Sequence, residues 1–414
     1  MIKNYLIIVL LILGFNVHGQ YSWLNKDTLP SAGRFQSVGF SIGNTGYLVG
    51  GWTQYPSVTV NEVWAYNPST DAWTQKNSYP AGASDGASFV INDSAYIIGG
   101  YIGGGTYSST NYFYNATNDS WSSKSSFPGG AVGGAFHFVI NGLGYVGAGK
   151  RGSANTSNTV YSYSSSSDNW TSVAAFPESV VDPIGFAIDS FGYAGLGSDG
   201  GTHTSSNFYK YSPVSNTWAP IASFPGGARS STMCFVIDGK AYVGGGYAVS
   251  PSNSSVTYDL GDFYSYDPSN DSWTLVPGIP GRGRHGASSF NINSNGYIVG
   301  GYDGFISQTL SKVAEFGTCS QITGIMPVPG GNNKSGIEIY PNPSSYDVNV
   351  KIDASITTEI KYEVVSVDGK LIRSGSTNQN TFGFNAANLS NGVYLLTITD
   401  NQGVQGTERF EVIH

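Results

Sequence analysis

The chain has 414 residues, a formal net charge of −8 at neutral pH and a charged fraction of only 11%. This acidic balance, together with the lack of a run of Lys or Arg, argues against a nucleic-acid partner or an anionic membrane surface, because both require a basic patch. An aromatic fraction of 14% and 56 glycines are typical of a protein built from many short strands and turns.

The first segment, Met1–Gly19, has the features of a secretory signal peptide. Lys3 precedes an apolar run from Tyr5 to Phe15, and the small residue Gly19 follows at the expected cleavage position. The apolar run is too short to span a bilayer. No later apolar stretch is long enough either, so we expect an exported mature chain that begins at Gln20 and has no transmembrane segment.

The next part of the chain repeats one unit six times. A tyrosine recurs at steps of 49, 49, 48, 49 and 55 residues, at Tyr47, Tyr96, Tyr145, Tyr193, Tyr242 and Tyr297. A Phe lies seven residues before each of these tyrosines and a Gly lies four residues after it. Each unit contains short aromatic and β-branched runs separated by Gly, Pro, Asn and Asp clusters, which predict four short strands.

Six tandem units of this kind predict an all-β fold, a six-bladed β-propeller, because one four-stranded unit cannot bury both of its faces alone. Five units carry a Trp seven residues after an aromatic of the third strand: Trp73, Trp121, Trp170, Trp218 and Trp273. In the sixth unit that place is Thr323, and the Trp in register is Trp23. We therefore expect the N-terminal strand around Trp23 to close the ring by completing the sixth blade.

The repeat positions resemble those of kelch-repeat propellers, in which a Gly-Gly pair follows the second strand and a Tyr and a Trp follow at nearly fixed spacing. The resemblance covers about Trp23 to Phe316, with four features in register across six copies. The third and fourth copies depart from the double glycine, with Ala148-Gly149 and Leu196-Gly197. The resemblance implies a propeller domain over residues 20–317, but a fold does not by itself fix a function.

The pattern changes after the repeats. Residues 318–336 have Gly pairs, prolines and asparagines without periodicity, which indicate a linker. Residues 337–414 contain short alternating strands and the turn pair Asp368-Gly369, which predict a small C-terminal β-sandwich.

This tail resembles the C-terminal sorting domain of the type IX secretion system of Bacteroidota. The matching segments are Tyr340-Pro341-Asn342-Pro343, Val367-Asp368-Gly369-Lys370 and Leu389-Ser390-Asn391-Gly392-Val393-Tyr394-Leu395-Leu396. The resemblance implies that the type IX machinery is a partner of the tail, and that the protein is released from the cell or attached to its outer surface. The alternative is an ordinary appended sandwich that binds or spaces.

A candidate ligand site lies at one mouth of the expected central channel. Three arginines share the position thirteen residues before the recurring Tyr: Arg34, Arg229 and Arg284. This position begins the innermost strand of each blade, so we expect the three to converge on one opening. Neighbouring rim positions add Gln36, Asp85, Asp182 and His285. Such a group suits capture of a carboxylate or a sugar acid, whereas the alternative is that each Arg only ties adjacent blades through backbone carbonyls.

Three further features each have more than one interpretation. Trp52 directly follows a Gly pair, where it either stacks on a sugar ring or packs. The loop Tyr247–Asp262, which explains the step of 55 residues, is either a binding loop or a tolerated insertion. Cys234 takes a place that is mostly small in the other repeats, so it is either a small buried residue or a reactive or metal-binding thiol. A third alternative in an exported protein is a disulfide bond with Cys319.

No spacing of His, Cys or acidic residues predicts a metal site, and no Gly-rich stretch opens a helix, so we expect neither a metal nor a cofactor. The favoured function is a secreted or cell-surface propeller that binds a glycan or a protein. The alternative is an enzyme acting on a sugar acid, since some extracellular kelch propellers, such as sialic acid mutarotase, are enzymes. Asp85 or Asp182 would then supply the acid–base groups. Copper chemistry of the galactose oxidase kind is not expected, because no histidine pair is evident.

Overall fold

A computed structural model describes residues 21–152, 155–201, 203–250, 253–318, 337–340, 347–352, 359–366, 371–390, 392–400 and 403–412. The expected signal peptide, Cys319 and nearly all of the expected linker lie outside these residues. Every regular element in the described part of the chain is a β-strand. Over the same residues, no helix has the length and apolar character needed to cross a membrane.

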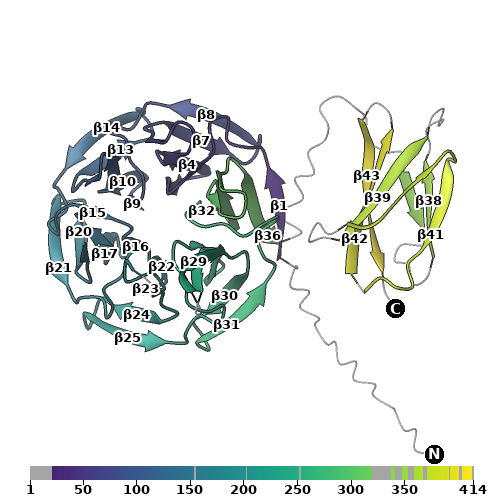
Figure 1. Ribbon diagram of the computed structural model, residues 1–414. Coiled ribbons are helices and arrows are strands. Elements are labelled where there is room, and N and C mark those ends of the chain that lie inside the picture. The colour runs from purple at the N-terminus through teal and green to yellow at the C-terminus, as the bar shows by residue number, and fades with distance from the viewer. Residues whose placement is uncertain are drawn as a thin grey trace, which may run out of the picture.

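Residues 21–318 form six four-stranded antiparallel sheets around a central opening (Figure 1). From the inner to the outer strand, the first three sheets contain β3 (Val38–Ile42), β4 (Thr45–Val49), β7 (Val63–Asn67) and β8 (Ala72–Lys76); β9 (Ala87–Ile91), β10 (Ser94–Ile98), β13 (Asn111–Asn115) and β14 (Ser120–Lys124); β16 (Phe136–Ile140), β17 (Leu143–Gly147), β20 (Val160–Ser164) and β21 (Asn169–Val173). The other three contain β22 (Ile184–Ile188), β23 (Phe191–Gly195), β24 (Phe208–Ser212) and β25 (Thr217–Ile221); β26 (Met233–Ile237), β27 (Lys240–Gly244), β30 (Phe263–Asp267) and β31 (Ser272–Val276); β32 (Ser288–Ile292), β33 (Asn295–Val299), β36 (Val313–Thr318) and β1 (Tyr21–Lys26).

The sixth sheet joins the N-terminal strand to the last strand of the repeats. β1 pairs with β36 in an antiparallel register that places Trp23 opposite Phe316. The indole N–H of Trp23 donates to the carbonyl oxygen of Pro277 in the preceding repeat, at 2.8 Å. The five other repeat tryptophans make the same kind of bond to the preceding sheet, as Trp121 does to Asn77 at 3.0 Å. Trp23 therefore occupies the structural place of the Trp that the sixth repeat lacks.

The apolar cores lie between neighbouring sheets. One core, for example, combines Val38 and Val63 of the first sheet with Ile97 and Tyr114 of the second. The sheets approach closely where a glycine precedes the recurring Tyr. A Cβ on Gly144 would lie 2.5 Å from the ring of Phe89 in the preceding sheet, so this position has no room for a side chain. Inter-sheet packing of this kind explains why the repeats bury their faces only as a set.

Residues 337–412 form two sheets of their own. The first has the order β37 (Ile337–Tyr340), β38 (Asp347–Ile352), β41 (Thr381–Asn385), and the second the order β40 (Leu371–Thr377), β39 (Ile360–Ser366), β42 (Gly392–Asp400), β43 (Gly403–Val412). Side chains of both sheets, including Val348, Val364 and Leu396, are fully buried in a single shared core. The tail therefore has the sandwich architecture that its sequence predicts.

A candidate site at the mouth of the channel

One residue from each repeat contributes to a ring at the channel mouth. These residues lie eleven positions before the recurring Tyr, and all six have φ between 52° and 63°: Gln36, Asp85, Gly134, Asp182, Ser231 and Gly286. Each backbone N–H donates to the carbonyl oxygen of the preceding member, at 2.6–3.2 Å, and the N–H of Gln36 donates to Gly286. The six bonds thus form a closed cycle. Four of the six ring residues are not glycine, and a non-glycine residue at positive φ is uncommon. The surrounding bonds must therefore hold the backbone in this conformation.

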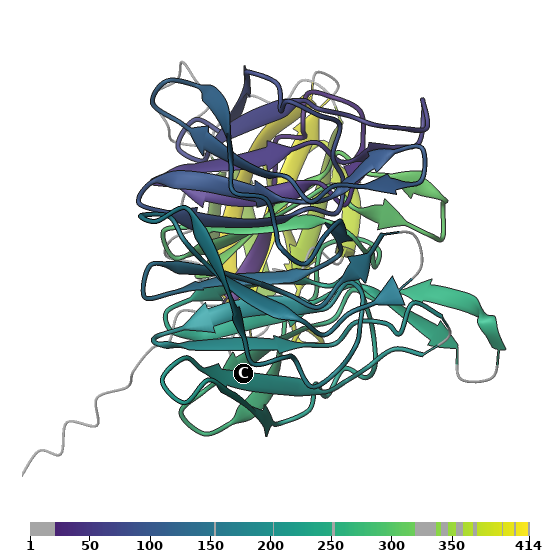
Figure 2. The same ribbon diagram turned by 90° about the vertical axis from the view of Figure 1, so that its left-hand side faces the viewer.

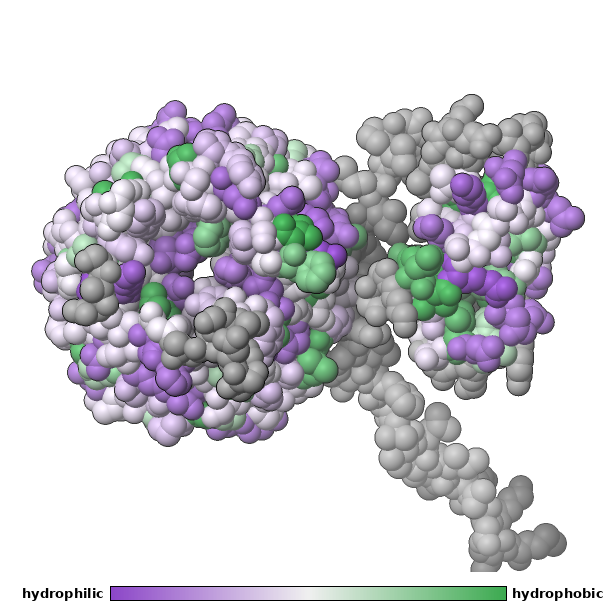
Figure 3. Space-filling view, viewed as in Figure 1, coloured by the Kyte–Doolittle hydropathy of each residue, from purple (hydrophilic) through white to green (hydrophobic). Residues whose placement is uncertain are grey.

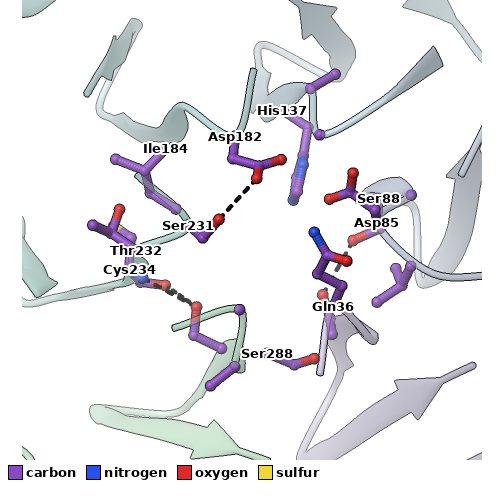
Figure 4. A pocket seen from close by; sticks show the side chains of 18 of the residues that line it. Gln36, Asp85, Ser88, His137, Asp182, Ile184, Ser231, Thr232, Cys234 and Ser288 are labelled. Atoms are coloured by element: carbon purple, nitrogen blue, oxygen red, sulfur yellow. Dashed lines mark hydrogen bonds between the residues drawn. The ribbon is translucent and has the colours of Figure 1, made fainter. Parts of the chain in front are cut away.

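The ring surrounds a cavity of about 170 Å³. Its walls include the side chains of Gln36, Asp85, His137, Asp182 and Ser231 (Figure 4). The opening at the centre of the propeller is also visible in the space-filling view (Figure 3). A second cavity of about 250 Å³ lies further along the inner strands. Six residues line both cavities, one from each sheet: Gly39, Ser88, His137, Gly185, Cys234 and Ser289.

The three arginines do not line the mouth, contrary to the expected convergence. Arg34, Arg229 and Arg284 are only 1%, 1% and 2% exposed. Each Nη1 donates to the carbonyl oxygen of a glycine sixteen residues later, at 3.2, 3.2 and 3.4 Å respectively. Each guanidinium therefore holds together the loops of its own repeat. These hydrogen bonds to backbone carbonyl oxygens favour the structural alternative. They join segments within one repeat, however, and not adjacent blades as that alternative assumed.

Two of the arginines also form ion pairs. Nη2 of Arg34 lies 2.6 Å from Oε2 of Glu62, and Nη1 of Arg229 lies 2.7 Å from Oδ1 of Asp262. Arg229 further donates to the carbonyl oxygen of Gly226. These partners compensate the charge of both groups inside the protein, as a buried guanidinium requires.

The carboxyl groups of Asp85 and Asp182 meet across Gly134, which has no side chain to separate them. A Cβ on Gly134 would lie 2.1 Å from Oδ1 of Asp182. Oδ2 of Asp182 accepts a hydrogen bond from the Ser231 hydroxyl at 2.8 Å. Oδ1 is buried, and no amide or hydroxyl of the described residues donates to it. The nearby carboxyl group of Asp85 interacts with Asp182 electrostatically.

Burial raises the pKa of both carboxyl groups. The pKa of Asp85 lies well above its usual range, because the effect of burial is reinforced by the charge of Asp182. The pKa of Asp182 is also raised by burial, but the hydrogen bond from Ser231 and the charge of His285 oppose the rise. The two carboxyl groups therefore titrate as an interacting pair, in which the pKa of Asp85 is raised more strongly than that of Asp182. Perturbed pairs of this kind are typical of acid–base sites.

Two further groups face the channel in uncharged form. Burial lowers the pKa of His137 to about 4, so its imidazole is neutral at neutral pH. Its Nδ1 is buried, and no described residue bonds to it. Burial also raises the pKa of the Cys234 thiol, which disfavours the reactive thiolate. Among the described residues Cys234 is free, and the alternative pairing with Cys319 falls outside them.

A rim of mainly aromatic side chains stands beside the ring. Each rim residue lies five positions after the recurring Tyr. It pairs in an antiparallel β-bridge with the residue just before the ring member of its own repeat, as Trp52 does with Phe35 and Tyr302 with His285. The six rim residues are Trp52, Tyr101, Lys150, Ser198, Tyr247 and Tyr302, and all except Ser198 are partly exposed. Of these six, only Trp52 is a candidate ligand contact from the sequence alone. The shared repeat position was the signal that would have revealed the other four partly exposed residues.

His285 lies next to the ring but has a different environment from the one expected. Its Nδ1 lies 2.7 Å from Oδ1 of Asp259, and its ring contacts Phe35, Tyr247 and Tyr302. It lines a separate cleft beside the mouth. The structure thus gathers Gln36, Asp85 and Asp182 at the mouth and places His285 at its edge.

Comparison with known protein families identifies the parts of the chain. The kelch motif matches residues 40–78, and the secretion system C-terminal sorting domain matches residues 338–412. The chain therefore contains a kelch motif and a secretion system C-terminal sorting domain. The sorting domain indicates export to the cell surface or the extracellular space. A third family, N-acetylneuraminate epimerase, matches residues 174–317 of the kelch propeller, a range that includes Asp182 and His285 but not Asp85.

Two individual proteins are similar to the kelch propeller. The N-acetylneuraminate epimerase of Haemophilus influenzae (strain 86-028NP) is 28% identical over 102 residues, which cover 23% of this chain and 27% of that protein. The match therefore spans only about a quarter of that relative. The solved structure of YjhT superimposes with a TM-score of 0.59 and 15% identity, covering 69% of this chain and 96% of YjhT, and so supports a shared fold alone.

Proposed function

We propose that this exported kelch propeller binds carbohydrate at its channel mouth. The observation that carries the proposal is the polar ring of Gln36, Asp85, Asp182 and Ser231 beneath a rim of partly exposed aromatic side chains. A sugar presents hydroxyl groups around its edge and an apolar face of C–H groups. Carboxyl, amide and hydroxyl groups match the first feature, and aromatic rings match the second.

The proposal includes the architecture that presents this mouth. We propose that the six sheets are the blades of one ring closed by β1, which the pairing of β1 with β36 and the cycle of six backbone bonds support. We further propose that residues 1–19 are a removed signal peptide and that residues 318–336 link the propeller, residues 20–317, to the sorting domain, residues 337–414.

A second candidate, favoured by the Asp85–Asp182 pair and by the family match over residues 174–317, is catalysis of sugar ring opening. The Asp85 carboxyl would donate its proton to the ring oxygen of a cyclic sugar while the Asp182 carboxylate accepts the proton of the anomeric hydroxyl. The ring C–O bond breaks and a carbonyl group forms. Closure on the other face of the carbonyl returns both protons and gives the other anomer, so no co-reactant is consumed.

Binding is tested with the full-length protein on a glycan array, followed by calorimetry with each saccharide that binds. We expect Trp52→Ala and Asp182→Asn to weaken binding at least about tenfold, the loss typical of a residue that makes one good polar or stacking contact. The matched control is Asp189→Asn, because Asp189 also has a positive φ, of 54°, but is exposed at a turn. If no saccharide binds, or if the mouth variants bind as the control does, the proposal is wrong.

The second candidate is tested by following exchange between sugar anomers by NMR. Catalysis predicts faster exchange with the wild-type protein and loss of that acceleration in both Asp85→Asn and Asp182→Asn, with acceleration kept in Asp189→Asn. Saturable binding without faster exchange would leave the binding function and exclude this catalysis.

A further inference from the structure

A large cleft lies beside the mouth and is distinct from it. Its volume is about 810 Å³, and it lies between the hairpin of β28 (Tyr247–Ser250) and β29 (Asn253–Asp259) and the turn that links β34 (Tyr302–Asp303) to β35 (Gln308–Thr309). Hairpins of these two repeats project from the same side of the propeller (Figure 2). The hairpin β28–β29 is the insertion that lengthens the fifth repeat.

The walls of the cleft are held in place by Asp259. One of its carboxylate oxygens lies 2.7 Å from Nδ1 of His285, and the other accepts a hydrogen bond from the N–H of Gly304 at 2.5 Å. Asp303 organises the opposite turn by accepting hydrogen bonds from the N–H groups of Phe305 and Ile306, at 3.0 and 3.3 Å. The inserted hairpin is therefore docked on the sixth repeat, and these bonds hold the walls of the cleft in place.

The lining combines one uncompensated cation with exposed aromatic faces. Phe305 is 81% exposed and Tyr258 is 47% exposed. Ile306, the next residue in the chain after Phe305, is also exposed. The guanidinium carbon of Arg282 lies 4.2 Å from the centre of the Phe305 ring.

Arg282 differs from the two acidic groups of the cleft in having no polar partner. Among the described residues, neither an ion pair nor a hydrogen bond involves its guanidinium group. Both oxygens of Asp259 are engaged, and the charge of Asp303 acts on the buried Arg284. A guanidinium that is stacked on an exposed ring and free of carboxylates is prepared to bind an external anion, and its planar fork fits a carboxylate group.

His285 connects this cleft to the mouth. Its ring contacts the rim residues Tyr247 and Tyr302, at 5.2 and 5.4 Å between ring centres. Its charge also lowers the pKa of Asp182 within the mouth. A ligand that leaves the mouth over this part of the rim therefore passes His285 and reaches Arg282.

We propose that the cleft is a subsite for an acidic sugar unit, so that the protein recognises a saccharide of two or more units. One unit occupies the mouth, and a neighbouring unit places its carboxylate against Arg282 and its C–H face against Phe305 or Tyr258. This inference rests on the proposed binding of carbohydrate at the mouth. It explains the insertion in the fifth repeat as part of a binding site.

The test uses a library of soluble uronate-containing oligosaccharides in which each acid is paired with its methyl ester. The ester removes the charge and keeps the sugar rings, so the pair isolates the carboxylate. We expect the full-length protein to bind at least one acid about tenfold or more tighter than its ester, as one charge-assisted contact allows. The preference for the acid should shrink as salt is raised, because Arg282 is exposed.

Variants assign the preference to the cleft. Arg282→Gln should abolish the preference for the acid and leave the affinity for the ester unchanged, whereas Phe305→Ala should weaken both ligands. The matched control is Lys124→Gln, since Lys124 also lies over a Phe ring, at 5.2 Å, but on an outer strand of the second sheet. Equal binding of every acid and ester, or a preference that persists in Arg282→Gln, would overturn the subsite.

The outcomes separate the subsite from the proposed function. If esters bind and Asp182→Asn abolishes their binding but no acid is preferred, the mouth binds sugar and the subsite is wrong. If acids bind through Arg282 while Trp52→Ala and Asp182→Asn have no effect, the cleft binds an anion and the sugar site at the mouth is wrong.

Discussion

Trp23 lies opposite Phe316 in the ladder between β1 and β36, and the centres of their rings are 4.9 Å apart. This contact joins the two ends of the repeat region within one sheet. The Trp23 indole also contacts Phe235 and Phe263 of the fifth sheet, so it packs in the space between the fifth and sixth sheets.

Replacing Trp23 with Ala should lower the free energy of unfolding of the propeller by about 3 kcal/mol, since the change removes a large aromatic side chain and the bond to Pro277. The midpoint of chemical denaturation measures the effect. Tyr55→Ala is the control, because Tyr55 is 82% exposed and should have almost no effect. Unchanged stability in Trp23→Ala would contradict the proposed role of β1 in closing the ring.

Arg229→Ala should destabilise the propeller by about 3 kcal/mol, because the change leaves Asp262 and the carbonyl oxygens of Gly226 and Gly245 without their donor. Arg229→Lys should recover only part of this loss, because lysine keeps the charge but lacks the planar fork. Denaturant unfolding and saccharide binding should be measured on the same samples. If Arg229→Ala has normal stability but no longer binds saccharide, Arg229 would instead belong to a ligand site.

The raised pKa of Asp85 predicts a dependence of stability on pH. Burial and the charge of Asp182 raise the pKa of Asp85 in the folded protein. The unfolded carboxyl ionises above about pH 4, but the folded one does not, so this group lowers stability progressively as the pH rises from about 4 through its folded pKa.

Asp85→Asn should remove this contribution, because the amide is neutral at every pH and asparagine tolerates the positive φ of this position. The variant should therefore be more stable than the wild type at pH 7, and the two should be close at pH 4. Unfolding curves across this range, with Asp189→Asn as the control, measure the difference. A wild type that gains stability relative to Asp85→Asn with rising pH would show that Asp85 is ionised.

The tail should fold without the propeller, since its core, as far as the structure describes it, draws only on residues 337–412. Limited proteolysis should cut first between Gly317 and Lys334, and mass spectrometry should find both fragments intact. The isolated propeller should keep the melting temperature that it has in the full chain. Early cuts inside the six sheets, or a lower melting temperature of the isolated propeller, would speak against separate folding.

The sequence alone determined the repeat and much of its register. Regular spacing of Tyr, Phe, Gly and Trp predicted four strands in each unit, and the displaced Trp23 predicted the partner of β36. Repeat position also brought Asp85 and Asp182 to the same end of the channel. These inferences succeed because equivalent positions in a repeat become neighbours when the units are arranged around one axis.

Only the tertiary structure decided where the side chains point and what they contact. Arg229 lies two residues before the ring member Ser231, yet its guanidinium turns away from the mouth to partners sixteen and thirty-three residues further on. Asp85 and Asp182 meet because the repeat between them contributes Gly134 to the ring. Where a side chain points, and which groups it contacts, depends on positive φ angles and on contacts between distant segments. A spacing pattern records which residues are equivalent, but it does not contain these angles and contacts.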